Sequence, residues 1–360
     1  MRIVLAGGGT AGHVEPALAV AREFRNRDAS TEILFVGTSH GIENQLVPEA
    51  GFDLAHINKL SFPRRISPAL ILWPFRFVNI VVQALAIVAK SDAVIGFGGY
   101  VSAPIYVAAA IRRIPIFVHE ANALPGLANR LGSLIARSTM VAFASTQTGT
   151  MRNAEIVGIP LRESIVSAAS LNKAERNETR ARTLAEWGMK DLPTILIFGG
   201  STGSAHMNSV VSESVNSLLD HNLQIVHVVG KKNELPLSRP GYLPLHYIDS
   251  MAEALIAADV VISRSGAVTC VELAVLNKFA LLVPLSIGNG EQRFNGEPLV
   301  ANNQALMIEN KEFTSKWLSH NIDDLIARSK GEHRGALRFP LNSAQLIVDI
   351  VEKEMKEDVR

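Results

Sequence analysis

The chain opens with Arg2-Ile-Val-Leu-Ala-Gly-Gly-Gly-Thr-Ala-Gly-His13, in which a short apolar run leads directly into a glycine-rich turn. Four apolar residues at helical spacing follow the turn: Val14, Leu18, Ala21 and Phe24. A second short apolar run occupies residues 31–37. Apolar strands that alternate with amphipathic helices are typical of a parallel sheet, so this opening predicts an α/β fold.

The same pattern returns in the second half of the chain. Residues 194–203 repeat the opening strand and turn, and residues 259–267 repeat the strand and turn of residues 92–100. A further apolar strand follows in each half, at 115–118 and 280–283. Because three elements match in the same order, the sequence predicts two tandem Rossmann-like domains.

We place the domain boundary after Arg162, with an N-terminal domain of residues 1–162 and a C-terminal domain of residues 163–340. Residues 341–360 predict a C-terminal helix, which could pack back on the first domain, although the sequence alone does not decide its place. The apolar stripe of this helix consists of Ile347, Ile350, Val351 and Met355.

The composition indicates a folded intracellular protein. Of the 360 residues 48% are hydrophobic and 19% charged, and a single cysteine excludes an internal disulfide framework. The net charge of +1 gives no basic footprint for nucleic acid. Residues 1–162 nevertheless hold 15 Lys and Arg against 10 Asp and Glu, so the first half favours anionic partners. We recognise neither a secretion signal nor an apolar run of about 20 residues that could span a membrane.

The spacing Gly7-x-Gly9-x-x-Gly12 matches the dinucleotide fingerprint and lies between a strand and a helix. NAD and FAD are disfavoured, because no acidic residue follows the 31–37 strand to bind a ribose. The turn instead predicts a site for a phosphate or a developing anion at the helix N-terminus. His13 beside it is our candidate general base; the alternative is a polar residue that completes the loop.

Polar residues after other strands are further site candidates. The turn at 199–203 offers Ser201 to a phosphate, although its glycines could serve packing alone. Glu120 and Asn122 follow a strand and would face the ligand crevice, with helix capping as the alternative for Asn122. In the loop 287–295, Gln292 and Asn295 have side-chain amides suited to sugar hydroxyls, unless the loop is an ordinary polar one.

Glu272 falls within an apolar helix, where a carboxylate needs a partner. A ribose diol or the nearby Arg264 could meet that need. Cys270 is expected to be a small buried residue rather than a nucleophile. The sequence contains no Walker motif, Asp-x-Asp motif or histidine cluster, so we expect no metal; Arg162 and backbone dipoles would stabilise a leaving diphosphate.

Cations and apolar residues are concentrated between Asp53 and Asp92, a stretch without any acidic residue. Its five cations are Lys59, Arg64, Arg65, Arg76 and Lys90. We expect residues 62–77 to lie on the surface of an anionic membrane, and residues 80–88 to form a buried core helix.

Six motifs in fixed order resemble the MurG family of glycosyltransferases, over nearly the whole chain. They are Gly8-Gly-Thr-Ala-Gly-His13, Gly96-Phe-Gly-Gly-Tyr-Val-Ser102, His119-Glu-Ala-Asn-Ala-Leu-Pro-Gly126, Val157-Gly-Ile-Pro-Leu-Arg162, Gly199-Gly-Ser201 and Ser263-Arg-Ser-Gly-Ala-Val-Thr269. The resemblance implies a GT-B fold with two Rossmann-like domains facing a central cleft. It implies a hexosyltransferase without a cofactor, at the cytoplasmic face of the plasma membrane.

The implied reaction transfers N-acetylglucosamine from UDP-GlcNAc to the 4-hydroxyl of the muramyl sugar of lipid I, with inversion, to give lipid II for the cell wall. His13, directly or through Glu120, would accept the proton. By the same resemblance, Ile248 would contact the uracil, Glu272 the ribose, and Arg162 and Ser201 the diphosphate. The full implied set of donor contacts is Thr10, Ala11, Gly12, Asn122, Arg162, Ser201, Ile248, Ala267, Val268, Thr269, Cys270, Val271, Glu272 and Gln292.

The sequence departs from the family pattern at some positions. Ala11 stands where the family often has glycine, which requires a negative φ there, and Ser204 replaces a common alanine. Two alternative functions follow from the same fold: a glycosyltransferase with another acceptor, and a nucleotide-sugar sensor or epimerase that transfers nothing.

Overall fold

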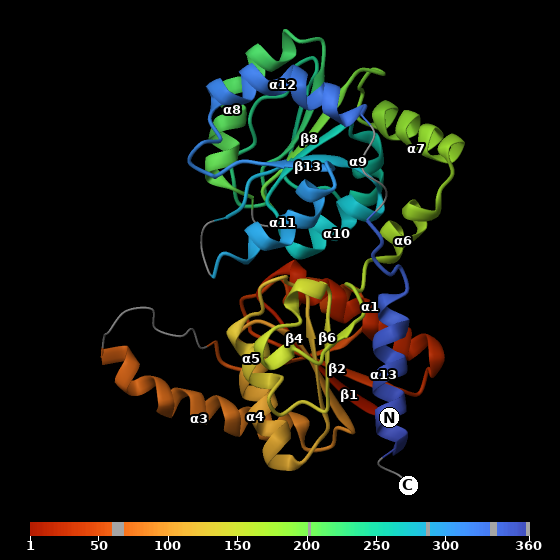
Figure 1. The fold of residues 1–360 in the computed structure, drawn as a ribbon. Helices are drawn as coiled ribbons and strands as arrows, with labels where there is room; N and C mark the ends of the chain where they lie inside the picture. Colours follow the sequence, from red (N-terminus) through yellow and green to blue (C-terminus); the bar gives the residue numbers. More distant parts are fainter. Residues whose placement is uncertain (60–67, 201–202, 286–288, 332–336, 358–360) are drawn as a thin grey trace. The chain divides into compact units, whose positions relative to one another are not determined.

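A computed structural model describes residues 1–59, 68–200, 203–285, 289–331 and 337–357 of the chain (Figure 1). The chain divides into two compact units. Unit 1 comprises Met1–Arg162 together with Pro340–Arg360, and unit 2 comprises Glu163–Phe339. Each unit is built on one sheet whose neighbouring strands all run parallel, as the sequence predicts for an α/β protein.

Unit 1 has a seven-stranded sheet in the order β3-β2-β1-β4-β5-β6-β7. Its strands are β1 Arg2–Gly7, β2 Glu32–Gly37, β3 Asp53–His56, β4 Ala93–Gly98, β5 Ile116–Glu120, β6 Ser138–Val141 and β7 Glu155–Ile156. Its helices are α1 Ala11–Arg27, α2 Glu43–Glu49, α3 Pro68–Val88, α4 Ser102–Arg112, α5 Leu127–Gly132 and α13 Ser343–Glu357, with short 3-10 turns at Ala144–Thr146 and Gly149–Met151.

Unit 2 has a six-stranded sheet in the order β10-β9-β8-β11-β12-β13. Its strands are β8 Thr194–Phe198, β9 Gln224–Val228, β10 Tyr242–Leu245, β11 Val260–Ser263, β12 Phe279–Leu282 and β13 Ala305–Met307. Its helices are α6 Glu163–Ser170, α7 Lys173–Glu186, α8 Ala205–Leu219, α9 Met251–Ala257, α10 Ala267–Val275, α11 Glu291–Ala301 and α12 Ser315–Ser329.

The strands that repeat in the sequence occupy equivalent positions in the two sheets. β1 pairs with β2 and β4 at the centre of its sheet, and β8 pairs with β9 and β11 in the same way. Strands β5 and β12, which pair with β4 and β11, also occupy matching positions. The two strand orders agree over six strands, which confirms the prediction of two Rossmann-like units.

The C-terminal helix α13 packs against α1 of unit 1 (Figure 1). Ile347, Val348 and Val351 are completely buried in the same cluster as Val14 and Phe24. Arg27 of α1 adds a hydrogen-bonded ion pair to Asp349 of α13, with Nη1 and Oδ1 2.7 Å apart. Helix α13 therefore completes the core of the first unit, which settles a placement that the sequence leaves open.

Helix α3 corrects the predicted boundary at residue 77. One continuous helix covers both the stretch expected at a membrane and the stretch expected in the core. Ile80, Ala84 and Val88 are buried, but Val78 and Val82 are exposed on the same helix. The exposed apolar face therefore extends past residue 77. Phe62, Arg64 and Arg65 lie outside the described residues.

We predict that Ile347→Ala destabilises unit 1 alone. Removing a completely buried isoleucine side chain leaves a cavity and typically costs about 2–5 kcal/mol. Hydrogen exchange followed by mass spectrometry should show faster exchange in β1 and α1 and unchanged exchange in β8 and β9. Equal acceleration in both units, or none in α1, would contradict the docking of α13 described above.

Candidate active site

In unit 1 the first strand turns into α1 through Gly8, Gly9 and Thr10. Gly9 has a φ of +89°, a conformation that residues with a side chain rarely adopt. Thr10 is the extended N-cap residue, and the helix starts at Ala11. Ala11 is not among the residues with positive φ, so its methyl group is accommodated at this position. The turn is thus tight, and it sets the start of the helix that carries His13.

His13 is held by its Nδ1 atom. This nitrogen lies 3.2 Å from the carbonyl oxygen of Gly8 and 3.4 Å from Thr10 Oγ1. Because a carbonyl oxygen only accepts, Nδ1 must carry the proton in this hydrogen bond. In the neutral ring Nε2 is then the proton acceptor, which is the state that a general base requires.

Two glycines at the end of β4 make room for the His13 ring. Gly98 and Gly99 both have positive φ, and a Cβ atom on either would come within 3.4 Å of His13 ring nitrogens. The turns after β1 and β4 therefore meet at His13. The register of the sheet explains this, since Gly7 pairs with Gly98 where the two strands end.

Glu120 lies at the end of β5 but is fully engaged by its own loop. One carboxylate oxygen accepts from the backbone and side-chain nitrogens of Asn122, both at 2.9 Å. The other accepts from Gly126 N and Asn129 Nδ2, both at 3.0 Å. Four donors fill this buried carboxylate, so its geometry is that of a loop organiser rather than of a proton acceptor.

His119, one residue earlier, is also structural. Its side chain is completely buried, and Nε2 lies 2.9 Å from the carbonyl oxygen of Gly158. Burial lowers the pKa of His119 to about 4, so the ring is neutral at physiological pH. It connects the end of β5 to the segment that leads toward Arg162.

In unit 2 the turn after β8 and the start of α8 form the corresponding corner. Gly203 has a φ of +76°, and a side chain there would collide with the carbonyl oxygen of Val229. Ser204 caps α8 by accepting from Met207 N at 3.4 Å. Packing alone thus requires glycine at 203. Ser201 lies outside the described residues.

Arg264 contributes a link that the sequence does not reveal. Its buried guanidinium donates to Ser204 Oγ at 2.8 Å, to Asn310 Oδ1 at 2.7 Å and to the carbonyl oxygen of Val283 at 2.9 Å. It therefore connects the cap of α8 to the loop after β12. The serine at 204 supplies an acceptor that alanine would lack.

The residues of helix α10 that are predicted to bind the sugar donor fall into two groups. Ala267, Val268 and Thr269 form its first turn after the N-cap Gly266, where backbone N–H groups have no partner within the helix. Cys270 and Val271 are completely buried, so their side chains cannot reach a ligand. Burial also raises the pKa of the Cys270 thiol, which excludes a thiolate nucleophile.

The remaining predicted site residues lie in several elements of unit 2 and at the end of unit 1. Ile248 follows β10 and is nearly buried. Gln292 lies in the first turn of α11, and its Oε1 accepts from Leu285 N at 2.9 Å, which leaves its NH2 group to donate. Asn295 is buried and donates to the carbonyl oxygen of Ser265 at 3.3 Å, so it supports the turn before α10. Glu272 is buried within α10, and Arg162 is half-buried at the end of unit 1.

A carboxylate that the sequence analysis did not select lies beneath the first turn. Glu43, at the start of α2, is completely buried, and its Oε2 accepts from Gly9 N at 3.0 Å. The amide of Gly9 is therefore occupied within the protein and is not free to bind a phosphate. Gly37 and Gly41 stand shortly before Glu43 in the sequence, but no spacing pattern links Glu43 to Gly9.

The described residues offer no metal site. They contain no group of three or more His, Cys, Asp or Glu side chains that could hold a metal ion. None of their helices is both long and apolar enough to cross a bilayer.

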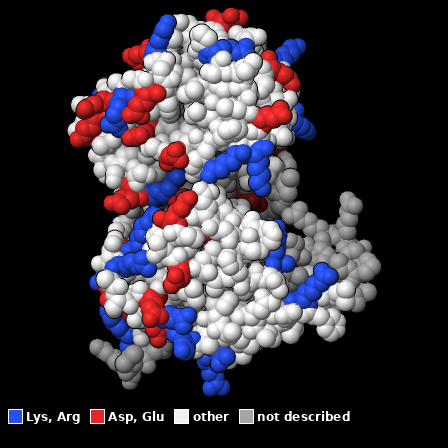
Figure 2. Space-filling view, turned by 180° about the vertical axis from the view of Figure 1, so that it is seen from behind, with Lys and Arg blue, Asp and Glu red and all other residues white. Residues whose placement is uncertain are grey.

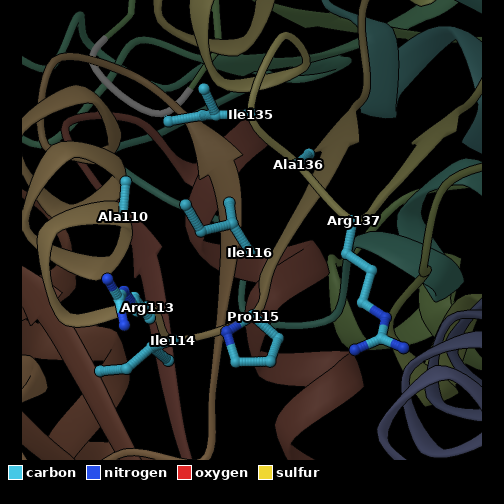
Figure 3. Close-up of a pocket in the computed structure, with 8 residues that line it drawn as sticks. All are labelled: Ala110, Arg113, Ile114, Pro115, Ile116, Ile135, Ala136 and Arg137. Carbon is cyan, nitrogen blue, oxygen red and sulfur yellow. The ribbon is translucent and has the colours of Figure 1, made fainter. Parts of the chain in front are cut away.

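A pocket of about 400 Å³ lies at the amino ends of β5 and β6, lined by Pro115, Ile116 and Arg137 among others (Figure 3). Because it is at the sheet edge opposite His13, it is not part of this site.

Comparison with known proteins identifies the family. The N-terminal domain of glycosyltransferase family 28 matches residues 3–141, and the C-terminal domain of that family matches residues 194–349. A UDP-N-acetylglucosamine--N-acetylmuramyl-(pentapeptide) pyrophosphoryl-undecaprenol N-acetylglucosamine transferase of Streptomyces avermitilis is 44% identical over 335 residues, or 91% of this chain and 90% of the relative. The protein of that name from Corynebacterium diphtheriae is 40% identical and covers 100% of this chain and 98% of its own.

Solved structures agree with the fold. The crystal structure of Acinetobacter baumannii MurG is 26% identical, with a TM-score of 0.72 over 98% of this chain and 99% of that chain. A UDP-GlcNAc 2-epimerase from Neisseria meningitidis matches with a TM-score of 0.62 over 98% of this chain and 100% of its own at 12% identity, which concerns the fold alone. The chain therefore belongs to glycosyltransferase family 28 and is a glycosyltransferase of the GT-B type, in line with its resemblance to MurG.

Proposed function

We propose that this protein transfers N-acetylglucosamine from UDP-GlcNAc to the 4-hydroxyl of the muramyl sugar of lipid I, which yields lipid II for cell-wall synthesis. Relatives whose names state this transfer are 40–44% identical to the chain. The observation in the structure that carries the proposal is His13, whose Nδ1 is engaged by Gly8 and whose Nε2 is therefore available to accept a proton.

In the proposed reaction the acceptor oxygen attacks the anomeric carbon from the face opposite the leaving group. The bond between that carbon and the phosphate oxygen breaks, UDP departs with the electron pair, and the configuration inverts. His13 Nε2 takes the hydroxyl proton as the new glycosidic bond forms. Glu120 keeps the loop of Asn122 in place and has no part in the proton transfer, because its carboxylate is already saturated.

We propose that unit 2 and Arg162 bind the donor. The open amides of Ala267, Val268 and Thr269 lie at the positive end of the α10 dipole, where they would bind an anion. Arg162 would add a full positive charge for the diphosphate. From the family resemblance, Glu272 would bind the ribose, Ile248 the uracil and Gln292 the sugar, while Ser201, Thr10, Ala11, Gly12 and Asn122 would complete the contacts. Cys270 and Val271 would support α10 from inside the core.

The transfer is tested with labelled UDP-GlcNAc, a lipid I analogue and EDTA. We expect labelled disaccharide product in the presence of EDTA, since Arg162 and backbone amides would stabilise the leaving diphosphate. Consumption of the donor without acceptor would instead indicate an epimerase or hydrolase. Binding of the donor without turnover would indicate a sensor.

In that assay His13→Ala should lower kcat by about 10²-fold or more, because a general base contributes about 10²–10⁴-fold to a rate. The KM for UDP-GlcNAc should change little. Arg162→Ala should chiefly weaken UDP binding. His320→Ala, an exposed histidine of α12, is the matched control. An unchanged kcat in His13→Ala would remove this residue from the role of base.

We further propose that unit 1 binds the cytoplasmic surface of the plasma membrane as a peripheral protein. Leu72, Phe75, Val78 and Val82 are exposed along α3, and Phe75 is 73% exposed. Helix α4, which packs on α3, and the segment of α5 add four further exposed apolar residues: Ile111, Leu127, Leu131 and Leu134.

The charges near these apolar residues suit an anionic surface. Between Asp53 and Glu155 the acidic residues are Asp92 and Glu120, and Glu120 is buried. In the view of Figure 2, the coloured side chains on the right-hand part of unit 1 are mostly Lys and Arg. Exposed apolar side chains with cations beside them favour the headgroup layer of an anionic bilayer.

We predict that the double variant Phe75→Ser/Val78→Ser binds vesicles containing anionic lipids several-fold more weakly than the unaltered protein. Co-sedimentation with such vesicles and with neutral vesicles measures the difference. Leu237→Ser removes a residue of unit 2 that is 85% exposed and should leave binding unchanged. Equal loss in both variants would contradict the assignment of the surface to α3.

A further inference from the structure

The buried carboxylate of Glu43 is held by neutral donors. Oε2 accepts from Gly9 N at 3.0 Å, while Oε1 accepts from Thr38 N at 2.9 Å and from Thr38 Oγ1 at 3.3 Å. Among the described residues, no Lys, Arg or His forms an ion pair with Glu43. A completely buried carboxylate is costly to maintain, so its location needs an explanation.

Three glycines from separate segments leave the space that Glu43 fills. A Cβ atom on Gly8, in the turn after β1, would lie 2.9 Å from Glu43 Oε1. A side chain on Gly37, at the end of β2, or on Gly41, before α2, would overlap the Glu43 side chain. The carboxylate is therefore enclosed by backbone, and it reaches one particular peptide group of the first turn.

That peptide group is the one between Gly8 and Gly9. Its N–H donates to Glu43, and its C=O accepts from His13 Nδ1 at 3.2 Å. In a trans peptide the N–H and C=O point in opposite directions, so fixing one fixes the other. Both flanking residues are glycines, which would otherwise allow this peptide plane to rotate.

Rotation of this peptide plane would reverse both contacts. The carbonyl oxygen would then face the carboxylate of Glu43, which is repulsive, and the N–H would face His13. Nδ1 would become an acceptor, and the ring proton would move to Nε2. A ring with its proton on Nε2 cannot take a proton from an acceptor hydroxyl at that atom.

We infer that Glu43 is a positioning residue for the transfer reaction: by holding the Gly8–Gly9 peptide plane, it keeps the proton of His13 on Nδ1 and leaves Nε2 as the base. The inference rests on the proposed function for its catalytic consequence. The tautomer itself is a property of the protein that can be measured without substrate.

The test uses the full-length protein labelled with ¹⁵N-histidine. The ring-nitrogen shifts of His13, assigned with His13→Ala, should indicate the Nδ1–H tautomer at a pH where the ring is neutral. In Glu43→Gln an amide NH2 replaces one carboxylate oxygen, so the signal should shift toward the Nε2–H tautomer. Glu49→Gln, on the exposed end of the same helix, should leave the spectrum unchanged.

Steady-state kinetics of Glu43 variants distinguish a positioning role from a general loss of structure. Glu43→Gln should lower kcat by about tenfold or more with little change in the KM for UDP-GlcNAc. Glu43→Asp, whose shorter side chain cannot reach both partners, should show the same split and serves if Glu43→Gln does not fold. Glu49→Gln should retain full activity.

Two results would overturn the inference. One is an Nε2–H tautomer of His13 in the unaltered protein, and the other is an unchanged tautomer in a folded Glu43 variant. Neither result depends on transfer activity. A protein with the expected tautomer but no transfer to a lipid I analogue would instead refute the proposed function and leave the positioning role of Glu43 intact.

Discussion

In each unit the first strand has to turn into its helix within a few residues, and glycine makes that turn possible. Gly9 and Gly203 both have positive φ, and at Gly203 a side chain would collide with the neighbouring backbone. Because all strands of a parallel sheet end at the same edge, the turns after β1 and β4 meet there. His13 lies at that meeting point, and the proton transfer that we propose depends on how its ring is held.

Much of the fold could be predicted from the sequence because the signals are periodic. The apolar stripe of α1 is buried, in α13 Ile347 and Val351 are buried and Ile350 and Met355 partly so, and the internal repeat corresponds to matching strand orders in the two sheets. The predicted boundary at residue 77 divided α3 too early, since the exposed Val78 and Val82 alternate with core residues on one continuous helix. Short elements such as β3 and α2 carry too few residues for a period to be recognised.

The site was harder to predict because the roles of its residues are set by contacts between distant segments. Glu120 follows a strand where a proton acceptor could lie, but its own loop uses both oxygens. Arg264 is adjacent in sequence to α10, yet it holds the cap of α8 and the loop after β12. Glu43 acts on a peptide group 34 residues away. Hydrogen bonds of this kind leave no spacing pattern in a single sequence.

We propose that the donor is held by the open amides at the start of α10 in unit 2, whereas the Gly9 amide of unit 1 is occupied by Glu43. Hydrogen exchange with and without UDP-GlcNAc tests this division directly. We predict slower exchange at residues 266–269 on addition of the donor and no change at Gly9. Protection of Gly9 with unchanged exchange at 266–269 would contradict it.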